Sequence, residues 1–413
     1  MVDAHGNNLV FLLCTPRSGS SLATVMLQNH SKIFATQEMW FLMSLLDLKS
    51  APRRAYGGGA ILDRFFNGVL TEEMFTEACR SFALQVYNGL LRGGGGAELV
   101  IDKSPRYYYL LEFLDALFPR SRRIWLIRNP FAVLASYKKL GAFRGEALDV
   151  ARMLRSPAFE IKAVDLTVGL LRYCRYFARP DAYAYRLHYE KLVAAPKAEL
   201  AGACRFLGVD YEEGLEHYGA SRFSSKSDLY FSMGVGDPFV ADHAAPHGDS
   251  VHAWKEILSK QETELYGRML GAKLFAELGY GEELEEAEKR TGVRFDPEPD
   301  RDLMALRTRQ FTEATGRSWE ADYRMRTDLP VRLSEVQNAP EPDEPLLHSQ
   351  IRQLQMTVRT LEQRLETGIL EQRRLRSQLA AMKRKADWLK SAIPFGHRLS
   401  RLASVMAGGG GKK

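Results

Sequence analysis

The chain has 413 residues, of which 45% are hydrophobic and 26% are charged, and its formal net charge is +6. These proportions exclude a disordered or fibrous protein, and the length is sufficient for a large buried core. The four cysteines are far apart and form no Cys-x-x-Cys pair, which argues against a disulfide framework and against a zinc site. We therefore expect a cytoplasmic protein without a metal ion, a signal peptide or a membrane-spanning helix.

The first chemical signal is a strand, a turn and a helix start near the N-terminal end. Residues 9–13 are apolar, as in a buried parallel strand, Pro16–Ser21 break this pattern, and helical spacing resumes at Leu22. Such a turn points backbone N–H groups at one place, where Arg17 adds a positive charge, so it predicts a phosphate or sulfate site. It lacks the GxxxxGK[ST] pattern of a Walker A loop. An ordinary turn with a chance arginine is the alternative.

Strands and helices then alternate along the chain. Helices are expected at 39–48, 72–91 and 108–118, and short apolar strands at 99–101 and 124–127. This alternation predicts an α/β fold, a P-loop-like parallel sheet flanked by helices, whose ligands bind at the carboxyl ends of the strands. Asp102–Arg106 and Arg128 follow two of these strands, so we expect them to share one site with the first turn.

The next part of the chain contains two stretches without a period. We expect residues 141–157 to be a mobile segment over the site and residues 219–252 to be a loop or lid. The regular elements expected around them are helices at 161–177, 190–207 and 254–279 and a strand at 182–189. Gly279 is placed to cap the last of these helices, so the catalytic domain is expected to comprise residues 1–280.

The C-terminal part differs in composition from the rest. Residues 281–345 are charged and contain prolines, which predicts a linker with one short helix, and residues 346–392 carry six heptads with two lapses, which predicts an α-helical coiled coil. Residues 393–413 form a basic tail with an amphipathic start. We expect the coiled coil to make the chain a homo-oligomer, most simply a homodimer.

The positive charge is concentrated in that part of the chain. From His348 onward there are 14 Lys and Arg residues against 4 Asp and Glu, which leaves 43 basic and 47 acidic residues elsewhere. A basic segment favours contact with a polyanion or an anionic membrane surface. We expect peripheral contact with the inner face of the membrane and no nucleic-acid partner.

Four stretches together carry a family resemblance. Residues 15–21, TPRSGSS, resemble the 5′-phosphosulfate loop of sulfotransferases that use 3′-phosphoadenosine-5′-phosphosulfate (PAPS), as found in bacterial and carbohydrate-directed enzymes. Residues 124–140 resemble the 3′-phosphate motif of that family, with Ser136 eight residues after Arg128. DKSPR at 102–106, and YEKL at 189–192 with a trailing FLG, occur in the order of the family. The resemblance implies the sulfotransferase fold, with PAPS as co-substrate and no metal.

The resemblance implies that the first turn stabilises charge on the leaving 5′-phosphate during transfer. Arg17 stands where most members have Lys, and it keeps the charge while adding a second hydrogen-bonding nitrogen. Lys103 and Arg106 are implied to add positive charge near the sulfuryl group, although a solvated basic turn is the alternative. The other loop residues implied to bind the co-substrate are Ser18, Gly19, Ser20 and Ser21.

The resemblance also implies the contacts of the nucleotide. Arg128 and Ser136 would bind the 3′-phosphate and Tyr189 the adenine, while a helix-surface serine and a core tyrosine are the alternatives. The late Arg-Lys-Gly motif of the cytosolic members, which also binds the 3′-phosphate, is absent. Lys226 or Lys255 could replace it, and the sequence does not choose between them.

The candidate base is Glu38. Small-molecule cytosolic members use a histidine next to the segment that matches 102–105, and this chain has none there, whereas bacterial and carbohydrate-directed relatives carry a glutamate just past the first helix. A carboxylate partly desolvated beside Trp40 could act as the base, and a surface glutamate at a helix start is the alternative. His243, His247 and His252 are spaced oddly for a metal, so none is expected.

The function that follows is transfer of a sulfuryl group from PAPS to a hydroxyl or amine of an acceptor. The acceptor is expected to be a carbohydrate, a glycolipid or other lipid, or a small metabolite. One alternative is a P-loop kinase, which the missing Gly-Lys-Ser/Thr argues against. The other is a non-catalytic coiled-coil assembly protein with a degenerate nucleotide domain, which the presence of Arg17, Arg128 and Ser136 argues against.

Overall fold

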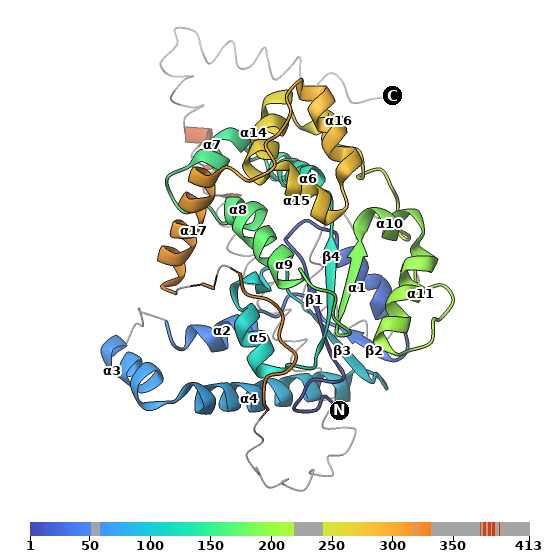
Figure 1. Cartoon of the computed structure of the whole chain (residues 1–413), viewed down its shortest axis with the longest axis vertical. Helices are drawn as coiled ribbons and strands as arrows, with labels where there is room; N and C mark the ends of the chain where they lie inside the picture. Colours follow the sequence, from blue (N-terminus) through green and yellow to red (C-terminus); the bar gives the residue numbers. More distant parts are fainter. Residues whose placement is uncertain are drawn as a thin grey trace, which may run out of the picture. The chain divides into compact units, whose positions relative to one another are not determined.

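Five parallel strands form the centre of the fold (Figure 1), in the order β2-β3-β1-β4-β5. Leu12 in the central strand β1 is level with Lys103 in β3 and with Ile124 in β4, so these strands end at one edge. The predicted parallel sheet is confirmed, while β2, with three residues, was too short to be recognised. The strands are β1 Leu9–Leu13, β2 Ile33–Ala35, β3 Leu99–Lys103, β4 Arg122–Ile127 and β5 Ala184–His188.

The computed structural model describes residues 1–50, 58–218, 243–317, 319–320 and 322–331, together with single positions between 372 and 388. The helices of the described part are α1 Ser20–Gln28, α2 Phe41–Asp47, α3 Gly59–Arg64, α4 Glu72–Gly93, α5 Leu111–Leu117, α6 Pro130–Phe143, α7 Val150–Arg155, α8 Ile161–Val164, α9 Leu170–Tyr176, α10 Tyr189–Ala194, α11 Pro196–Leu207, α13 Trp254–Ile257, α14 Lys260–Leu270, α15 Ala272–Leu278, α16 Gly281–Thr291 and α17 Arg301–Thr315. Shorter turns are the π-helices η1 Phe65–Val69 and η3 Asp165–Gly169 and the 3₁₀-helix η2 Tyr107–Tyr109.

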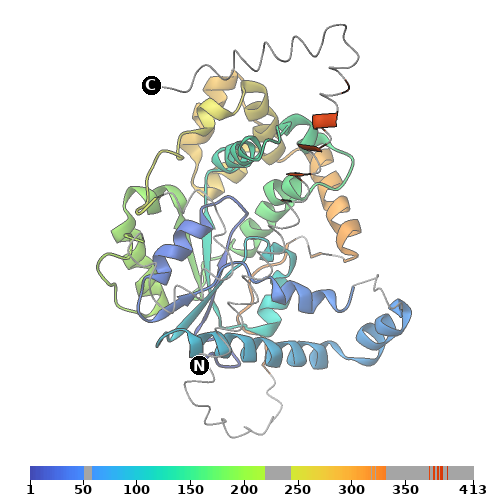
Figure 2. The ribbon, with the colours of Figure 1, turned by 180° about the vertical axis from the view of Figure 1, so that it is seen from behind.

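Helices cover both faces of the sheet (Figures 1 and 2). Successive side chains of a strand point to opposite faces, so Phe11 belongs to the core cluster beneath α4, α5, α6 and α9, and Leu12 to the cluster beneath α1 and α11. All five side chains of β1 are buried. The buried strand β1 therefore holds the start of the turn that follows it in a fixed position.

Several expected helices are interrupted. The stretch expected as one helix at 254–279 is three helices, because Ser259 forms a capping box with Glu262 that begins α14. Gly271, at φ 76°, then separates α14 from α15, and a Cβ at this glycine would lie 2.5 Å from the carbonyl carbon of Glu298. The segment expected to be mobile at 141–157 contains the end of α6 and all of α7.

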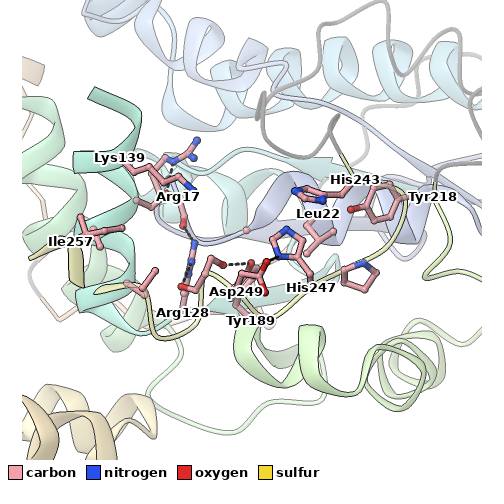
Figure 3. A pocket seen from close by; sticks show the side chains of 17 residues that line it. Arg17, Leu22, Arg128, Lys139, Tyr189, Tyr218, His243, His247, Asp249 and Ile257 are labelled. Atoms are coloured by element: carbon pink, nitrogen blue, oxygen red, sulfur yellow. Dashed lines mark hydrogen bonds and ion pairs between the residues drawn. The ribbon is translucent and has the colours of Figure 1, made fainter. Parts of the chain in front are cut away.

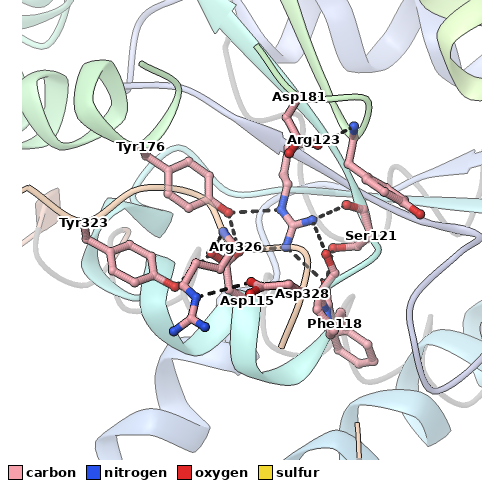
Figure 4. Close-up of polar contacts among 11 residues, drawn as sticks. Asp115, Phe118, Ser121, Arg123, Tyr176, Asp181, Tyr323, Arg326 and Asp328 are labelled. Carbon is pink, nitrogen blue, oxygen red and sulfur yellow. Dashed lines mark hydrogen bonds and ion pairs between the residues drawn. The ribbon is translucent and has the colours of Figure 1, made fainter. Parts of the chain in front are cut away.

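The boundary expected at Tyr280 requires a correction, because the compact unit extends to Pro342. Helix α16 contacts α14, and α17 contacts η3 and α8. Phe295 and Phe311 are buried in the core. The buried Asp115 accepts hydrogen bonds from the Tyr323 hydroxyl (2.9 Å) and from the backbone N–H of Arg326 (2.8 Å), as Figure 4 shows. Residues up to at least Arg326 are thus part of the core rather than a linker.

The second unit, Asp343–Lys413, contains the predicted coiled coil at 346–392 and the basic tail at 393–413. Almost all of it lies outside the described residues. The positions described between 372 and 388 are helical, and Leu375, Leu379 and Met382 are exposed. Across the described part of the chain, no helix is long and apolar enough to cross a membrane.

Candidate active site

The turn after β1 requires an unusual backbone. Gly19, the N-cap of α1, has φ 91°, and the non-glycine Arg17 has φ 72°. A Cβ at Gly19 would lie 2.3 Å from a ring carbon of Tyr189, so no larger residue fits without displacing that ring. Ser20 and Ser21 begin α1, where backbone N–H groups have no partner within the helix. The turn can therefore present N–H groups to an anion.

Three predicted site residues meet at this turn. The Arg17 Nε donates a hydrogen bond to the Ser136 Oγ (3.1 Å), although the two residues are 119 positions apart. One terminal nitrogen of Arg128 donates to the Arg17 carbonyl oxygen (2.9 Å), and its guanidinium lies 4.2 Å from the centre of the Tyr189 ring. The sheet thus brings together the ends of β1 and β4 and the helix α6.

Arg128 is a buried cation that forms no ion pair with any described carboxylate. It is 8% exposed, and among the described residues no carboxylate lies within ion-pair distance of it. Burial lowers the pKa of its guanidinium from the ordinary value. Its Nε makes no hydrogen bond within the described part of the chain. A buried polar atom without a partner is costly, so this arrangement fits an anionic ligand.

A cavity of about 280 Å³ opens beside Arg128 (Figure 3), and we call it the first cavity. Its wall joins the carboxyl ends of β1, β4 and β5 with α6 and with the segment 243–253. The polar or charged side chains in that wall are Arg17, Arg128, Ser136, Lys139, Tyr189, Tyr218, His243, His247, Asp249 and Ser250.

A second cavity of about 310 Å³ lies on the other side of the turn. Ser20, Ser21, Glu38, Trp40 and Arg106 form the part of its wall next to the turn. The outer part includes Arg144, Glu146 and Lys162. Arg17 and Gly19 are the two residues that line both cavities. The turn is therefore the partition between them.

Glu38 and Lys103 form an ion pair at the base of the second cavity. The Lys103 Nζ lies 3.1 Å from the Glu38 Oε1. The Lys103 side chain is fully buried and lines neither cavity, whereas the Glu38 side chain is 34% exposed and faces the second one. Lys103 ends β3 and Glu38 follows β2, so neighbouring strands hold the pair. Lys103 is placed to orient Glu38 from behind.

Arg106 is fixed in the wall by a buried acid. Its guanidinium donates two nitrogens to Asp165, at 2.8 and 3.0 Å, and the same carboxylate accepts hydrogen bonds from the hydroxyls of Tyr108 and Tyr137. Burial alone would lower the pKa of Arg106, but the hydrogen bonds and the charge of Asp165 outweigh it and raise that pKa above its usual value. Unlike Arg128, Arg106 is neutralised by the protein.

Some residues that the sequence suggested for the site do not line either cavity. The Ser18 hydroxyl is 3.0 Å from that of Thr15 and lines neither cavity. Lys255 forms an ion pair with Glu286 at 2.6 Å and lines neither cavity. Lys226 lies outside the described residues. No group of side chains suited to a metal ion occurs in the part that the structure describes.

The sequence did not identify Lys139 or Asp165 as parts of the site, and it predicted residues 219–252 only as a loop or lid. Lys139 lies three residues after Ser136 on α6, and i, i+3 residues share a helix face, so its spacing could have been used. Asp165 carries no such signal, because its neighbours come from η2 and α6.

Comparison with known proteins gives matches that include sulfotransferases. The model of the Sulfotransferase family matches residues 10–213. The nodulation protein NoeE of Sinorhizobium fredii is 29% identical over 294 residues, which cover 68% of this chain and 67% of the relative. A putative protein-tyrosine sulfotransferase of Caenorhabditis briggsae is 24% identical over 212 residues, covering 51% and 69%. The sulfotransferase domain of the Synechococcus PCC 7002 olefin synthase is 24% identical, covers 62% of this chain and 92% of that domain, and superposes with a TM-score of 0.41.

Proposed function

The chain belongs to the sulfotransferase family through residues 10–213, and we propose that it transfers a sulfuryl group from PAPS to a hydroxyl or amine of an acceptor. The choice of PAPS rests on the resemblance of residues 15–21 and 124–140 to its two phosphate-binding motifs. The contact between Arg17 and Ser136 supports it, because it unites residues from both motifs.

The observation that carries this proposal is the partition of two cavities by Arg17 and Gly19. A group-transfer enzyme must hold donor and acceptor on either side of the group that moves. In this chain the buried Arg128, which has no ion-pair partner among the described residues, lies on one side and the candidate base Glu38 on the other. The first cavity then holds the nucleotide and the second holds the acceptor.

The residues of the first cavity fit a bisphosphate nucleotide. Arg128 offers a buried Nε without a hydrogen bond, and Arg17 and Lys139 add positive charge to the wall. Tyr189 presents an aromatic ring, held by a 2.8 Å hydrogen bond between its hydroxyl and the Ser250 Oγ. Phosphates favour such cations, and a purine favours such a ring.

The residues on the two sides of the turn have different roles in the proposed reaction. Glu38 accepts the proton of the acceptor hydroxyl while the acceptor oxygen bonds to sulfur and the bond from sulfur to the 5′-phosphate oxygen breaks. Arg17 and the backbone N–H groups of Ser20 and Ser21 stabilise the negative charge that grows on that phosphate. Lys103 holds the Glu38 carboxylate in place, directed at the cavity.

The acceptor is proposed to be a carbohydrate or a lipid-linked carbohydrate. The supporting feature is Trp40, a 36% exposed aromatic side chain in the wall of the second cavity. An exposed ring of this kind offers a flat apolar face. We also propose that residues 346–392 mediate oligomerisation and that residues 393–413 make peripheral contact with a membrane.

Two measurements test the proposal. Calorimetry with adenosine 3′,5′-bisphosphate should show one site per chain, which a P-loop kinase would not offer. Incubation with ³⁵S-labelled PAPS and a panel of saccharides, glycolipids and phenols should then label at least one acceptor. Binding without turnover across the panel would favour the non-catalytic alternative, and absence of binding would contradict the proposal.

A further inference from the structure

The segment 243–253 closes one side of the first cavity and has no role so far. Its Ser250 is tied to the proposed nucleotide site at two points. The Ser250 carbonyl oxygen accepts a hydrogen bond from Arg128 (3.2 Å), and the Ser250 Oγ is 2.8 Å from the Tyr189 hydroxyl. The position of this segment is therefore coupled to two residues proposed to bind the nucleotide.

Two imidazole rings from this segment face the cavity. The rings of His243 and His247 lie 4.1 Å apart between centroids, and both belong to the cavity wall. The Nδ1 of His247 is 3.3 Å from the Asp249 carboxylate, in a geometry that makes no hydrogen bond within the described residues. Figure 3 shows the two rings beside Tyr218, with Lys139 and Arg17 across the view.

We propose that His243 and His247 bind the bisphosphate nucleotide, and that this pair takes up a proton when the nucleotide binds. The inference rests on the proposed function and adds a residue pair that the sequence left without a role. The pair then supplies positive charge where the Arg-Lys-Gly motif is missing, whereas Lys255 is paired with Glu286 and does not line the cavity.

The charge of the ligand explains why a proton is taken up when the ligand binds. Histidine changes its charge between about pH 5 and pH 8, and neighbouring negative charge favours its protonated form. A bisphosphate bound in the first cavity brings such negative charge beside the pair. The charged and titratable groups that line the cavity with the pair are Arg17, Arg128, Lys139, Tyr189, Tyr218 and Asp249.

The consequence is product binding that depends on pH. The spent nucleotide keeps the 3′- and 5′-phosphates, so it profits from the protonated pair at about pH 6 and loses this contact at about pH 8. Release of the spent nucleotide from the full chain is then expected to be faster at the higher pH.

The test is calorimetry of adenosine 3′,5′-bisphosphate with the full chain, at about pH 6 and pH 8, in buffers with different protonation enthalpies. The wild type should take up a measurable fraction of a proton on binding. His247→Gln should weaken binding about tenfold at the lower pH and less than about twofold at the higher one. Using the ratio of wild type to variant removes the titration of the ligand's own phosphates.

Further variants show whether the change in binding comes from the charge of the side chain or from a disturbed structure. His247→Lys keeps a positive charge at both pH values and should bind the bisphosphate at pH 8 more tightly than the wild type. His217→Gln is the matched control, because His217 lies beside Glu216 and lines neither cavity, and it should follow the wild type.

Two results would overturn the inference. One is bisphosphate binding without proton uptake in the wild type. The other is a double variant, His243→Gln with His247→Gln, whose binding changes with pH as that of the wild type does. Absence of binding at both pH values would instead contradict the proposed function, and the inference with it.

Discussion

The two cavities on either side of Arg17 differ in how their positively charged side chains are paired. In the first cavity Arg128 is buried, donates to carbonyl oxygens and faces an aromatic ring, with no carboxylate in ion-pair range among the described residues. In the second cavity Arg106 is bound by Asp165, and the ion pair of Lys103 with Glu38 lies at its base. Arg128 in the first cavity has no carboxylate partner among the described residues, whereas Arg106 and Lys103 at the second cavity are each paired with an acid.

This difference separates two kinds of task. A cation that the protein leaves unneutralised indicates a ligand that brings negative charge, because an unpaired buried charge is otherwise costly. A cation paired with an acid fixes the position and ionisation of that acid instead. We therefore attribute tight nucleotide binding to the first cavity and proton transfer to the second, and the predictions that follow test this assignment.

The largest expected effect is on the second cavity. Glu38→Gln should lower turnover with PAPS by about 10²- to 10⁴-fold, because the amide cannot accept the acceptor proton. Bisphosphate binding in the first cavity should stay within about twofold of the wild type. Steady-state kinetics and calorimetry on the same preparation measure both quantities.

The control for this variant must account for Lys103, which is fully buried. Removing its partner leaves a buried charge uncompensated, so thermal unfolding has to show that the variant is folded at the assay temperature. Glu146→Gln changes a glutamate in the same cavity outside the ion pair and should keep most of the activity. Near wild-type turnover of Glu38→Gln would show that Glu38 is a surface residue and that another group acts as the base.

The second prediction concerns the helix that supports the second cavity. Phe311 on α17 is fully buried, and its ring lies 4.6 Å from that of Tyr109 and 5.9 Å from that of Tyr108, which donates to Asp165. Phe311→Ala should lower the free energy of unfolding by about 3 kcal/mol, and Phe311→Leu by less. Chemical denaturation measures this loss. An unchanged stability would instead favour the linker that the sequence predicted for residues 281–345.

The sequence predicted the first cavity better than the second. Arg17, Arg128 and Ser136 follow strand ends at recognisable spacings, and a parallel sheet brings such ends together whatever the details of packing. The role of Asp165 could not be found in this way, because its partners come from separate elements that only the packed fold brings together. The sequence predicted one short helix within residues 281–345, and α17 is that helix. Its packing into the core was not predicted, because its buried face includes the polar Arg307 and Gln310, whose side chains donate hydrogen bonds to backbone carbonyls.

A third prediction compares the two arginines of the first cavity. Arg128→Ala should weaken adenosine 3′,5′-bisphosphate binding by about 1.5–3 kcal/mol, because a charge-assisted contact to the ground-state ligand is lost. Arg17→Ala should affect turnover more than binding, because its charge acts on the developing phosphate. Arg144→Ala, in the second cavity, should leave calorimetric binding unchanged. Equal losses of bisphosphate binding in the Arg17 and Arg128 variants would contradict the separate roles proposed for the two arginines.

The smallest effect is on stability and involves Asp102 on β3, beside the second cavity's ion pair. Burial raises the pKa of this carboxyl from 3.8 to about 6, although hydrogen bonds from Tyr87, Tyr107 and Ser104 oppose the shift. Between about pH 4 and pH 6 the folded state therefore holds a proton that the unfolded state lacks, so stability falls by about 2 kcal/mol as the pH rises through this window. Asp102→Asn cannot titrate and should lose this part of the pH dependence, as measured by denaturation at pH 4, 5 and 7. Identical pH profiles for variant and wild type would show that Asp102 does not hold this proton in the folded state.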